Sequence, residues 1–584
     1  MSTTAMGSPA IPEADHRIPP TSTEDIDAAI ETLRDNAKRW ADLDVGARIE
    51  LLDELAASTD AAAPAWARTG AEAKGLDPSS PLYGEDYGNG PYQVVKNIAA
   101  LKTTLEQIRD TGRPQPLDIR VRPNGQVAVD VFPVTIPDKI VYKGFEAEVW
   151  IKPEYTVEDV EEGLGQAYRN GADSAGVALV LGAGNVSSIG PMDCLYKLFV
   201  HNMVCVLKMN PVNEQTGPHI AEALAPLVRE GYLRIVYGGA AEGKYLTDHD
   251  GVDEIHITGS DKTVEAIVYG PGDEGRERKA NDDRRIDKPI SSELGNVTPV
   301  IVVPGPWRDK DLELQGENIA SMLTNNAGFN CVATRMMVQH QAWQRRRDLL
   351  DAVRGSLAEA EERDPYYPGA RERWQAFTAE HADAECFGPV GESAVPFTLL
   401  PDLDPDANGE IAFTTEAFTG VMGEVALDSP RSVPAYLDEA VRFCNERLWG
   451  NLAATIIVHP RSLKDPTVAA ALERAIEDLD YGVVTINHWS AGAGYGIVQT
   501  PWGAAPGNEM TDIQSGQGWV HNTYMIADEQ IQKTVVRGPF RPDAKPPWFH
   551  SHRTLPEVAA KATTLEATGD LKKLPGLVWE LVRG

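Results

Sequence analysis

The chain has 584 residues, 42% of them hydrophobic, and a formal net charge of −33. This length exceeds what one hydrophobic core usually serves, so we expect two large lobes with smaller additions. The acidic balance argues against a nucleic-acid partner, because phosphate binding requires clustered lysine and arginine. We interpret the charge mainly as a solubility feature.

The cysteines and histidines give no sign of a metal site or a disulfide framework. The five cysteines form no C-x-x-C pair, and the 12 histidines show no H-x-x-x-H spacing. The first residues lack a secretory pattern, and the longest apolar stretches, such as 177–181, are too short to span a bilayer. We therefore expect a cytoplasmic protein without a membrane span.

The N-terminal region begins with a Pro-rich, polar stretch over residues 1–20, which predicts a flexible or draped arm. A helix follows, with Ser22 or Thr23 as its cap and Ile26 and Ile30 on its apolar face. A second helix is predicted over residues 45–57.

In the middle of the chain, a segment in which apolar and polar residues alternate is followed by a series of strands and helices. Residues 127–134 and 140–151 predict a two-stranded excursion. From residue 175 onward, short apolar strands alternate with helices, which predicts an α/β fold with helices on both faces of a parallel sheet. A charged surface loop without periodicity is expected over 271–287, surface excursions between elements over 359–409, and one or two helices near 555–582.

Three side chains are candidates for a catalytic role. Cys331 lies in a loop of small and polar residues, Glu293 precedes an apolar strand, and Asn185 follows one. Each also has an ordinary interpretation: a packing thiol, an ion-pair carboxylate and a helix cap. The glycines at 182, 184 and 190 do not match the G-x-G-x-x-G dinucleotide pattern.

Taken in order, these segments resemble the aldehyde dehydrogenase superfamily over roughly residues 22–540. No single motif is specific, but their order is. The matching positions are Asn185 for the oxyanion-hole asparagine, Lys208 for the adenosine-ribose lysine, 257–260 for F-T-G-S, 293–295 for E-L-G-G, 328–331 for G-Q-x-C, 416–418 for E-I-F, Asn487 for a structural asparagine, and 501–503 with 515–518 for the closing P-F-G-G and S-G-x-G element.

The resemblance implies roles for ten residues. Cys331 would be the nucleophile, Glu293 the general base and Asn185 the oxyanion donor. The cofactor would be NAD or NADP, bound by Lys208, Gly259, Ser260, Leu294, Gly295, Glu416 and Phe418.

The resemblance also implies two Rossmann-like parallel-sheet domains and a small β element for oligomerisation, giving a homodimer or homotetramer. The expected ranges are an N-terminal arm over 1–21, a cofactor-binding domain over 22–126 and 152–289, a catalytic domain over 290–518, oligomerisation strands over 127–151 and 519–540, and a C-terminal extension over 541–584. The extension would either lengthen the contact between subunits or cover the substrate tunnel.

Several positions depart from the family pattern. The residue before Asn185 is glycine instead of tryptophan, and Phe329 replaces the glutamine of G-Q-x-C. Asn296 and Val297 replace the second glycine and the following lysine of the glutamate motif. Pro211 stands where an acid often binds the adenine ribose, which leaves the choice between NAD and NADP open.

The expected activity is oxidation of a small aldehyde to a carboxylic acid through a cysteine thiohemiacetal and an acyl-thioester. Glu293 favours release of a free acid, because branches that transfer the acyl group to coenzyme A often lack this glutamate. Two alternatives stay open: an acyl-CoA reductase or CoA-acylating enzyme, and a catalytically inactive relative that serves as an oligomeric scaffold.

Overall fold

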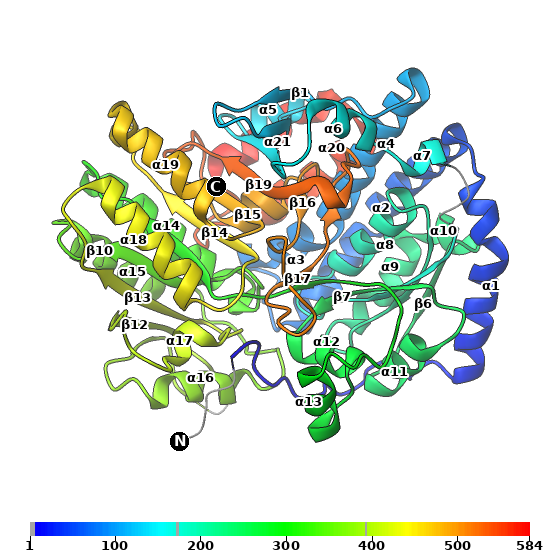
Figure 1. Cartoon of the computed structure of the whole chain (residues 1–584), viewed down its shortest axis with the longest axis horizontal. Helices are drawn as coiled ribbons and strands as arrows, with labels where there is room; N and C mark the ends of the chain where they lie inside the picture. The colour runs from blue at the N-terminus through cyan, green and yellow to red at the C-terminus, as the bar shows by residue number, and fades with distance from the viewer. Residues whose placement is uncertain (1–5, 171–174, 392–393) are drawn as a thin grey trace.

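Two mostly parallel β-sheets organise the chain, one in each of its lobes (Figure 1). The computed structural model describes residues 6–170, 175–391 and 394–584. Residues 1–5 of the expected arm, and residues 171–174 and 392–393 inside the expected domains, lie outside the described residues. The predicted α/β fold with parallel-sheet domains is confirmed.

The smaller sheet has six strands in the order β17-β8-β7-β4-β5-β6. All neighbours are parallel except β17, which pairs with β8 in the opposite direction. The strands β8 and β17 come from the range expected to form the catalytic domain. The strands are β4 (Val177–Leu181), β5 (Val204–Lys208), β6 (Leu233–Val236), β7 (Glu254–Gly259), β8 (Ile290–Leu294) and β17 (Gly516–Gln517); the helices between them are α8 (Ile189–Phe199), α9 (Gly217–Ala223), α10 (Ala225–Arg229), α11 (Ala240–Asp248) and α12 (Asp261–Val268).

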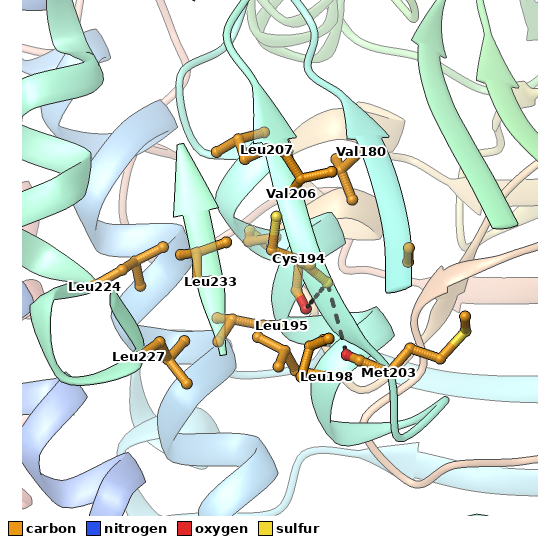
Figure 2. Packing of buried hydrophobic residues seen from close by; sticks show 14 of the residues in the cluster. Val180, Cys194, Leu195, Leu198, Met203, Val206, Leu207, Leu224, Leu227 and Leu233 are labelled. Carbon is orange, nitrogen blue, oxygen red and sulfur yellow. Dashed lines mark hydrogen bonds between the residues drawn. The ribbon is translucent and has the colours of Figure 1, made fainter. Parts of the chain in front are cut away.

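Helix α8 is buried along its whole length against this sheet. Figure 2 shows Cys194, Leu195 and Leu198 of the helix packed among side chains of β5, β6 and the α9–α10 region. The Cys205 thiol donates to the Cys194 carbonyl oxygen at 3.6 Å. The two cysteines therefore serve as packing residues.

The N-terminal helices cover the outer side of this lobe. Ser22 caps α1 (Thr23–Ala41) by accepting a hydrogen bond from the Asp25 backbone N–H, and the predicted apolar face is buried. Helix α2 (Val45–Ala73) runs much further than the predicted 45–57, because Ala63, Trp66 and Ala67 continue its buried face past Pro64. It packs against α4 (Gln93–Thr111).

The larger sheet has eleven strands in the order β1-β2-β3-β19-β15-β14-β9-β10-β13-β12-β11. Strand β19 runs parallel to β15 and antiparallel to β3, so the strands expected for oligomerisation continue the catalytic sheet of their own chain. Their contact with a second copy stays a prediction. The strands are β1 (Asp118–Val121), β2 (Val127–Phe132), β3 (Glu146–Ile151), β9 (Thr298–Val302), β10 (Thr334–His340), β11 (Glu385–Phe387), β12 (Phe397–Leu403), β13 (Val421–Leu427), β14 (Ala453–Ile457), β15 (Val483–Ile486) and β19 (Ile531–Arg537).

The expectation of an irregular loop over 271–287 is wrong for residues 272–280, which form α13 (Gly272–Ala280). The helix has no apolar stripe that sequence periodicity could detect. Ion pairs three and four residues apart, Asp273–Arg276 and Glu274–Arg278, lie along its exposed surface. Acidic residues occupy its first turn and basic residues its last, which suits the helix dipole.

Two further segments differ from the sequence prediction. Residues 136–141 form α5 (Ile136–Val141) instead of the start of a strand, because Thr135 and Asp138 make a capping box. The segment 359–409, expected as surface excursions, contributes α16 (Ala370–Ala379) and the buried strand β12.

The remaining helices cover the larger sheet and the back of the smaller lobe. The C-terminal extension forms α20 (Leu555–Thr568) and α21 (Leu574–Arg583), and α20 packs onto α2 and α4 (Figure 1). None of the helices in the described ranges is long and apolar enough to cross a membrane. Helices on the larger sheet are α14 (Asp309–Thr324), α15 (Arg346–Glu359), α18 (Val433–Arg447) and α19 (Pro466–Asp478).

Candidate active site

A cleft of about 810 Å³ lies at the carboxyl ends of β4, β5, β7 and β8, where ligands of α/β folds bind. Residues of the other lobe close its far side. The cleft is lined by all ten residues to which sequence analysis gave a role: Asn185, Lys208, Gly259, Ser260, Glu293, Leu294, Gly295, Cys331, Glu416 and Phe418. The structure therefore brings together side chains that lie up to 233 residues apart in the sequence.

The loop that presents Cys331 has an unusual backbone. Asn326, Ala327 and Gly328 all have positive φ, at 53°, 57° and 81°. A Cβ on Gly328 would lie 2.8 Å from the Gly420 nitrogen, so the position requires glycine. Arg335 donates to the Gly328 carbonyl oxygen at 2.6 Å and holds the loop in this shape.

The Cys331 thiol points at the Glu293 carboxylate, with 3.4 Å between Sγ and Oε1. Burial raises the pKa of the Cys331 thiol well above its ordinary value, and the carboxylates of Glu293 and Glu416 add to the effect. Burial, together with the charge of Asp193, raises the pKa of Glu293 to about 7. A carboxylate with such a pKa can exchange a proton near neutral pH.

Asn185 is fixed against the same loop. Its side-chain amide donates to the Phe329 carbonyl oxygen at 2.9 Å and carries a second N–H. Its backbone oxygen accepts hydrogen bonds from the side chains of Lys74, Asn326 and Tyr366. Sequence analysis missed this support, because the three residues lie far apart in the chain and form no motif.

Glu416 and Gly295 meet across the cleft. A Cβ on Gly295 would lie 2.2 Å from the carboxylate oxygens of Glu416, so glycine is needed for this close approach. Within the described part of the chain, Oε1 of Glu416 is buried and has no hydrogen-bond partner. Burial raises the pKa of this carboxyl to about 8.

The other predicted cofactor residues lie at the ends of neighbouring elements. Gly259 ends β7, and Ser260 caps α12. Lys208 ends β5, where burial lowers the pKa of its ammonium group to about 8. These groups fit a bound dinucleotide. The unpaired carboxylate oxygen of Glu416 could accept a hydrogen bond from a ribose hydroxyl, and the N-terminus of α12 could bind the pyrophosphate.

An aromatic cluster borders the cleft beside Phe418. The Phe418 ring lies 4.9 Å from the ring of Tyr367 and 6.1 Å from that of Phe329. Arg373 donates two hydrogen bonds to the Phe418 carbonyl oxygen, at 3.1 and 3.0 Å, and thereby fixes a residue whose φ is 42°. Tyr367 and Arg373 come from the segment that sequence analysis took for surface excursions.

The N-terminal arm crosses the cleft, and residues 8–14 line it. Figure 1 shows this dark-blue segment passing between the two lobes. The Ser8 backbone N–H donates to the Asp261 carboxylate at 3.0 Å, and the Glu416 backbone N–H donates to the Gly7 carbonyl oxygen at 3.2 Å. The arm is therefore draped over the site instead of lying apart from it.

A second cavity, of about 380 Å³, reaches Cys331 from the opposite side. Its walls include Trp489, Trp502 and Tyr495 and a long stretch of the C-terminal extension. Sequence analysis left two roles open for this extension; within the chain it lines the cavity that leads to Cys331. The thiol thus lies where the two cavities meet.

Comparisons with known proteins find similarity to aldehyde dehydrogenases. The model of the aldehyde dehydrogenase family matches residues 170–363. An aldehyde dehydrogenase of Enchytraeus buchholzi is 26% identical over 361 residues, 57% of this chain and 62% of the relative. Aldehyde dehydrogenase family 3 member A2 of Mus musculus is 22% identical over 53% of this chain and 59% of its own length. The alignments thus span about three-fifths of these relatives.

Solved structures share the fold. The NADP-dependent glyceraldehyde-3-phosphate dehydrogenase of Bacillus halodurans, complexed with NADP, superposes with a TM-score of 0.59 at 18% identity, covering 89% of this chain and 92% of the other. Aldehyde dehydrogenase 21 of Physcomitrella patens, in complex with the reaction product succinate, gives a TM-score of 0.60 at 14% identity, covering 92% and 95%.

Proposed function

The chain belongs to the aldehyde dehydrogenase superfamily, and from that premise we propose that it oxidises an aldehyde to a carboxylic acid with NAD or NADP. One observation carries the proposal. Cys331 lies where a cleft suited to a dinucleotide meets a separate cavity for a substrate, with Glu293 at 3.4 Å from its sulfur.

Cys331 begins the reaction. A thiol with a raised pKa needs a base, and the Glu293 carboxylate is placed to take its proton. The thiolate adds to the carbonyl carbon and forms a tetrahedral alkoxide. The second N–H of the Asn185 side chain and the Cys331 backbone N–H would stabilise the new negative charge, an effect of about 3 kcal/mol for one such donor.

Glu416, Lys208 and Ser260 would hold the dinucleotide through the groups described above. When bound, the nicotinamide supplies the hydride acceptor. Loss of hydride from the alkoxide leaves an acyl-thioester on Cys331. Glu293 releases the thiol proton to solvent, and its carboxylate then takes a proton from a water molecule, whose oxygen attacks the thioester. The tetrahedral intermediate releases the acid and the thiolate, and Glu293 returns a proton to the thiolate.

The buried Glu293 also separates this activity from acyl transfer to coenzyme A. Its pKa of about 7 suits it to activate water near neutral pH. We therefore expect the free acid as the product, with turnover that does not depend on coenzyme A.

The test is reduction of NAD⁺ or NADP⁺, followed at 340 nm, with a panel of aliphatic, aromatic and semialdehyde substrates in the presence and absence of coenzyme A. The proposal expects reduction without coenzyme A and one equivalent of acid per nicotinamide reduced. Folded protein that reduces neither cofactor with any aldehyde would instead support the inactive scaffold, and strict dependence on coenzyme A would support the acylating enzyme.

We also propose a homodimer or homotetramer. Strand β1 is the edge of the larger sheet, and Val121 on it is 59% exposed. An unpaired edge offers backbone groups to a second chain. A single monomeric mass by light scattering would contradict this proposal.

A further inference from the structure

We propose that the second cavity is a tunnel for an elongated, apolar aldehyde, and that the C-terminal extension supplies its binding wall. This inference rests on the proposed oxidation at Cys331 and names the substrate class of that site. Four features carry it: the composition of the wall, the places where the cavity begins and ends, the attachment of the extension, and the state of the charged groups nearby.

The wall that the extension contributes is apolar. Helices α20 and α21 form one hydrophobic cluster, and part of this cluster faces the cavity instead of being covered by protein. A cavity of about 380 Å³ is large enough for a drug-sized ligand. The apolar residues of α20 and α21 that line it are Leu555, Val558, Ala559, Ala562, Leu565, Leu577, Val578, Leu581 and Val582.

The cavity runs from the reacting thiol to the protein surface. Cys331 and Val332 line one part of it, together with the buried side chains of Trp489 and Trp502. Other lining residues are open to solvent: Ile140 is 45% exposed and Val582 is 69% exposed. Exposed aliphatic side chains at the rim suit a ligand whose apolar tail extends toward the surface.

The extension is a fixed wall. Thr564 of α20 donates to Asp60 of α2 at 2.9 Å, and Thr554 donates to the Glu580 carbonyl oxygen at 2.7 Å. A Cβ on Gly84 would lie 2.5 Å from the Pro556 nitrogen, and a Cβ on Gly492 would lie 2.5 Å from the Trp548 ring. These close approaches place Trp548 and the start of α20 against the body of the protein, and the Thr554 hydrogen bond ties α21 to α20.

The acidic groups on the buried part of the wall do not favour a charged substrate. Burial raises the pKa of Glu566 to about 7, although Lys96 opposes the shift. Glu85 is paired with Arg363 at 2.8 Å. Asp138 is used by the Thr135 capping box. The two lysines that line the cavity are paired, Lys143 with Asp543 at 2.6 Å and Lys545 with Glu317 at 3.4 Å. A carboxylated or phosphorylated tail would therefore find little free positive charge in the lining, whereas a hydrocarbon tail needs none.

The first test compares straight-chain aldehydes from two to ten carbons. Each methylene that enters the tunnel should raise kcat/KM by up to about three- to fourfold until the tunnel is full. Val582→Asp places a charge on the lining and should reduce kcat/KM for decanal by about tenfold or more, with propanal changed less than about twofold. Trp579→Asp is the matched control, because Trp579 lies on the same helix, is 63% exposed and does not line the cavity.

A binding measurement separates failure of this inference from failure of the proposed function. 1-Decanol cannot be oxidised through a cysteine adduct, but its chain should bind the protein without cofactor and change the fluorescence of the tryptophans that line the tunnel. Decanol binding without any aldehyde turnover would sustain the tunnel and refute the proposed function. Turnover that does not depend on chain length, or equal effects of the two substitutions, would overturn the tunnel.

A separate observation carries a second proposal: Glu13 of the N-terminal arm gives the cleft a preference for NAD over NADP. The Glu13 carboxylate accepts a hydrogen bond from the Ala240 backbone N–H at 3.2 Å, at the N-terminus of α11. Glu13 and Lys208 both line the cleft, and the Glu13 carboxylate is close enough to act on the charge of the Lys208 ammonium group. Pro211 stands where the family often has an acidic residue that binds the adenine ribose. In this chain Glu13 of the arm supplies a carboxylate that this position lacks.

This arrangement suits a ribose better than a phosphate. A ribose hydroxyl can donate to a carboxylate, whereas a 2′-phosphate would meet the Glu13 carboxylate and would have to displace it from the helix N-terminus. The arm thereby replaces a local sequence motif with a contact that spans more than 200 residues.

Isothermal titration of NAD⁺ and NADP⁺ into the protein without substrate tests this role without any turnover. The intact chain should bind NAD⁺ more tightly, and Glu13→Gln should lower the ratio of the two dissociation constants by about tenfold. Asp15→Asn removes a neighbouring exposed carboxylate that does not line the cleft and should leave the ratio unchanged. Equal affinities in the intact chain, or an unchanged ratio in Glu13→Gln, would overturn the proposal.

Discussion

The two cavities that meet at Cys331 are built in different ways. The cofactor cleft lies at strand ends, and short motifs supply most of its polar groups. The tunnel is lined mainly by helices, aromatic side chains and the C-terminal extension, and few of these residues besides Cys331 and Trp502 belong to a motif. Motifs therefore predict the reacting residues and the cofactor-binding residues. The substrate specificity instead depends on packing between segments that are distant in the sequence.

The largest effect should come from Cys331→Ser, which removes the nucleophile shared by both cavities. Aldehyde oxidation should fall by at least about a thousandfold, because a serine hydroxyl is far less readily ionised. Steady-state reduction of nicotinamide measures the loss. Titrations with NAD⁺ and decanol should remain unchanged. Cys386→Ser, at an exposed cysteine outside both cavities, should keep full activity.

Glu293→Gln should separate the two halves of the reaction. Without the general base, hydrolysis of the thioester should slow by about a hundredfold to a thousandfold. Rapid mixing should then show a burst of reduced nicotinamide followed by slow turnover. A uniform loss of burst and steady rate would assign Glu293 mainly to activation of the thiol.

Gly295→Ala should damage one cavity and spare the other. The new methyl group would displace the Glu416 carboxylate, so the affinity for NAD⁺ should fall by about tenfold or more. Calorimetric titration measures this affinity, and decanol binding should be unaffected. Gly355→Ala adds a methyl group where no atom lies within 4 Å and serves as the control. Equal losses for both ligands would show general unfolding.

The smallest effect concerns pH. The pKa of Glu293 is raised to about 7, so its carboxylate is ionised above that value and becomes protonated below it. The hydrolytic rate should therefore fall about tenfold between pH 8 and pH 6, with its midpoint near 7. Stopped-flow measurement of the steady phase follows this change. The hydrolytic rate of Glu293→Gln should show no midpoint near pH 7. If the variant keeps this midpoint, the titrating group is not Glu293.

The sequence predicted much of the fold because the alternating strands and helices have clear periodicity, and the order of motifs gave the resemblance to the aldehyde dehydrogenase superfamily. It also named ten residues that the structure collects in one cleft. It missed α13, whose charged surface carries no apolar period, and the hydrogen bonds from Lys74 and Tyr366 to Asn185. Such contacts join segments that only the folded chain brings together.

The most direct test of the account is mass spectrometry of peptides from Glu293→Gln after incubation with NAD⁺ and an aldehyde. Slow hydrolysis should let the acyl-enzyme accumulate, and the account predicts the mass of the acyl group on the peptide that contains Cys331. An acyl group on Cys194, Cys205, Cys386 or Cys444, or reduced nicotinamide without any acylated cysteine, would contradict the assignment of Cys331 as the nucleophile.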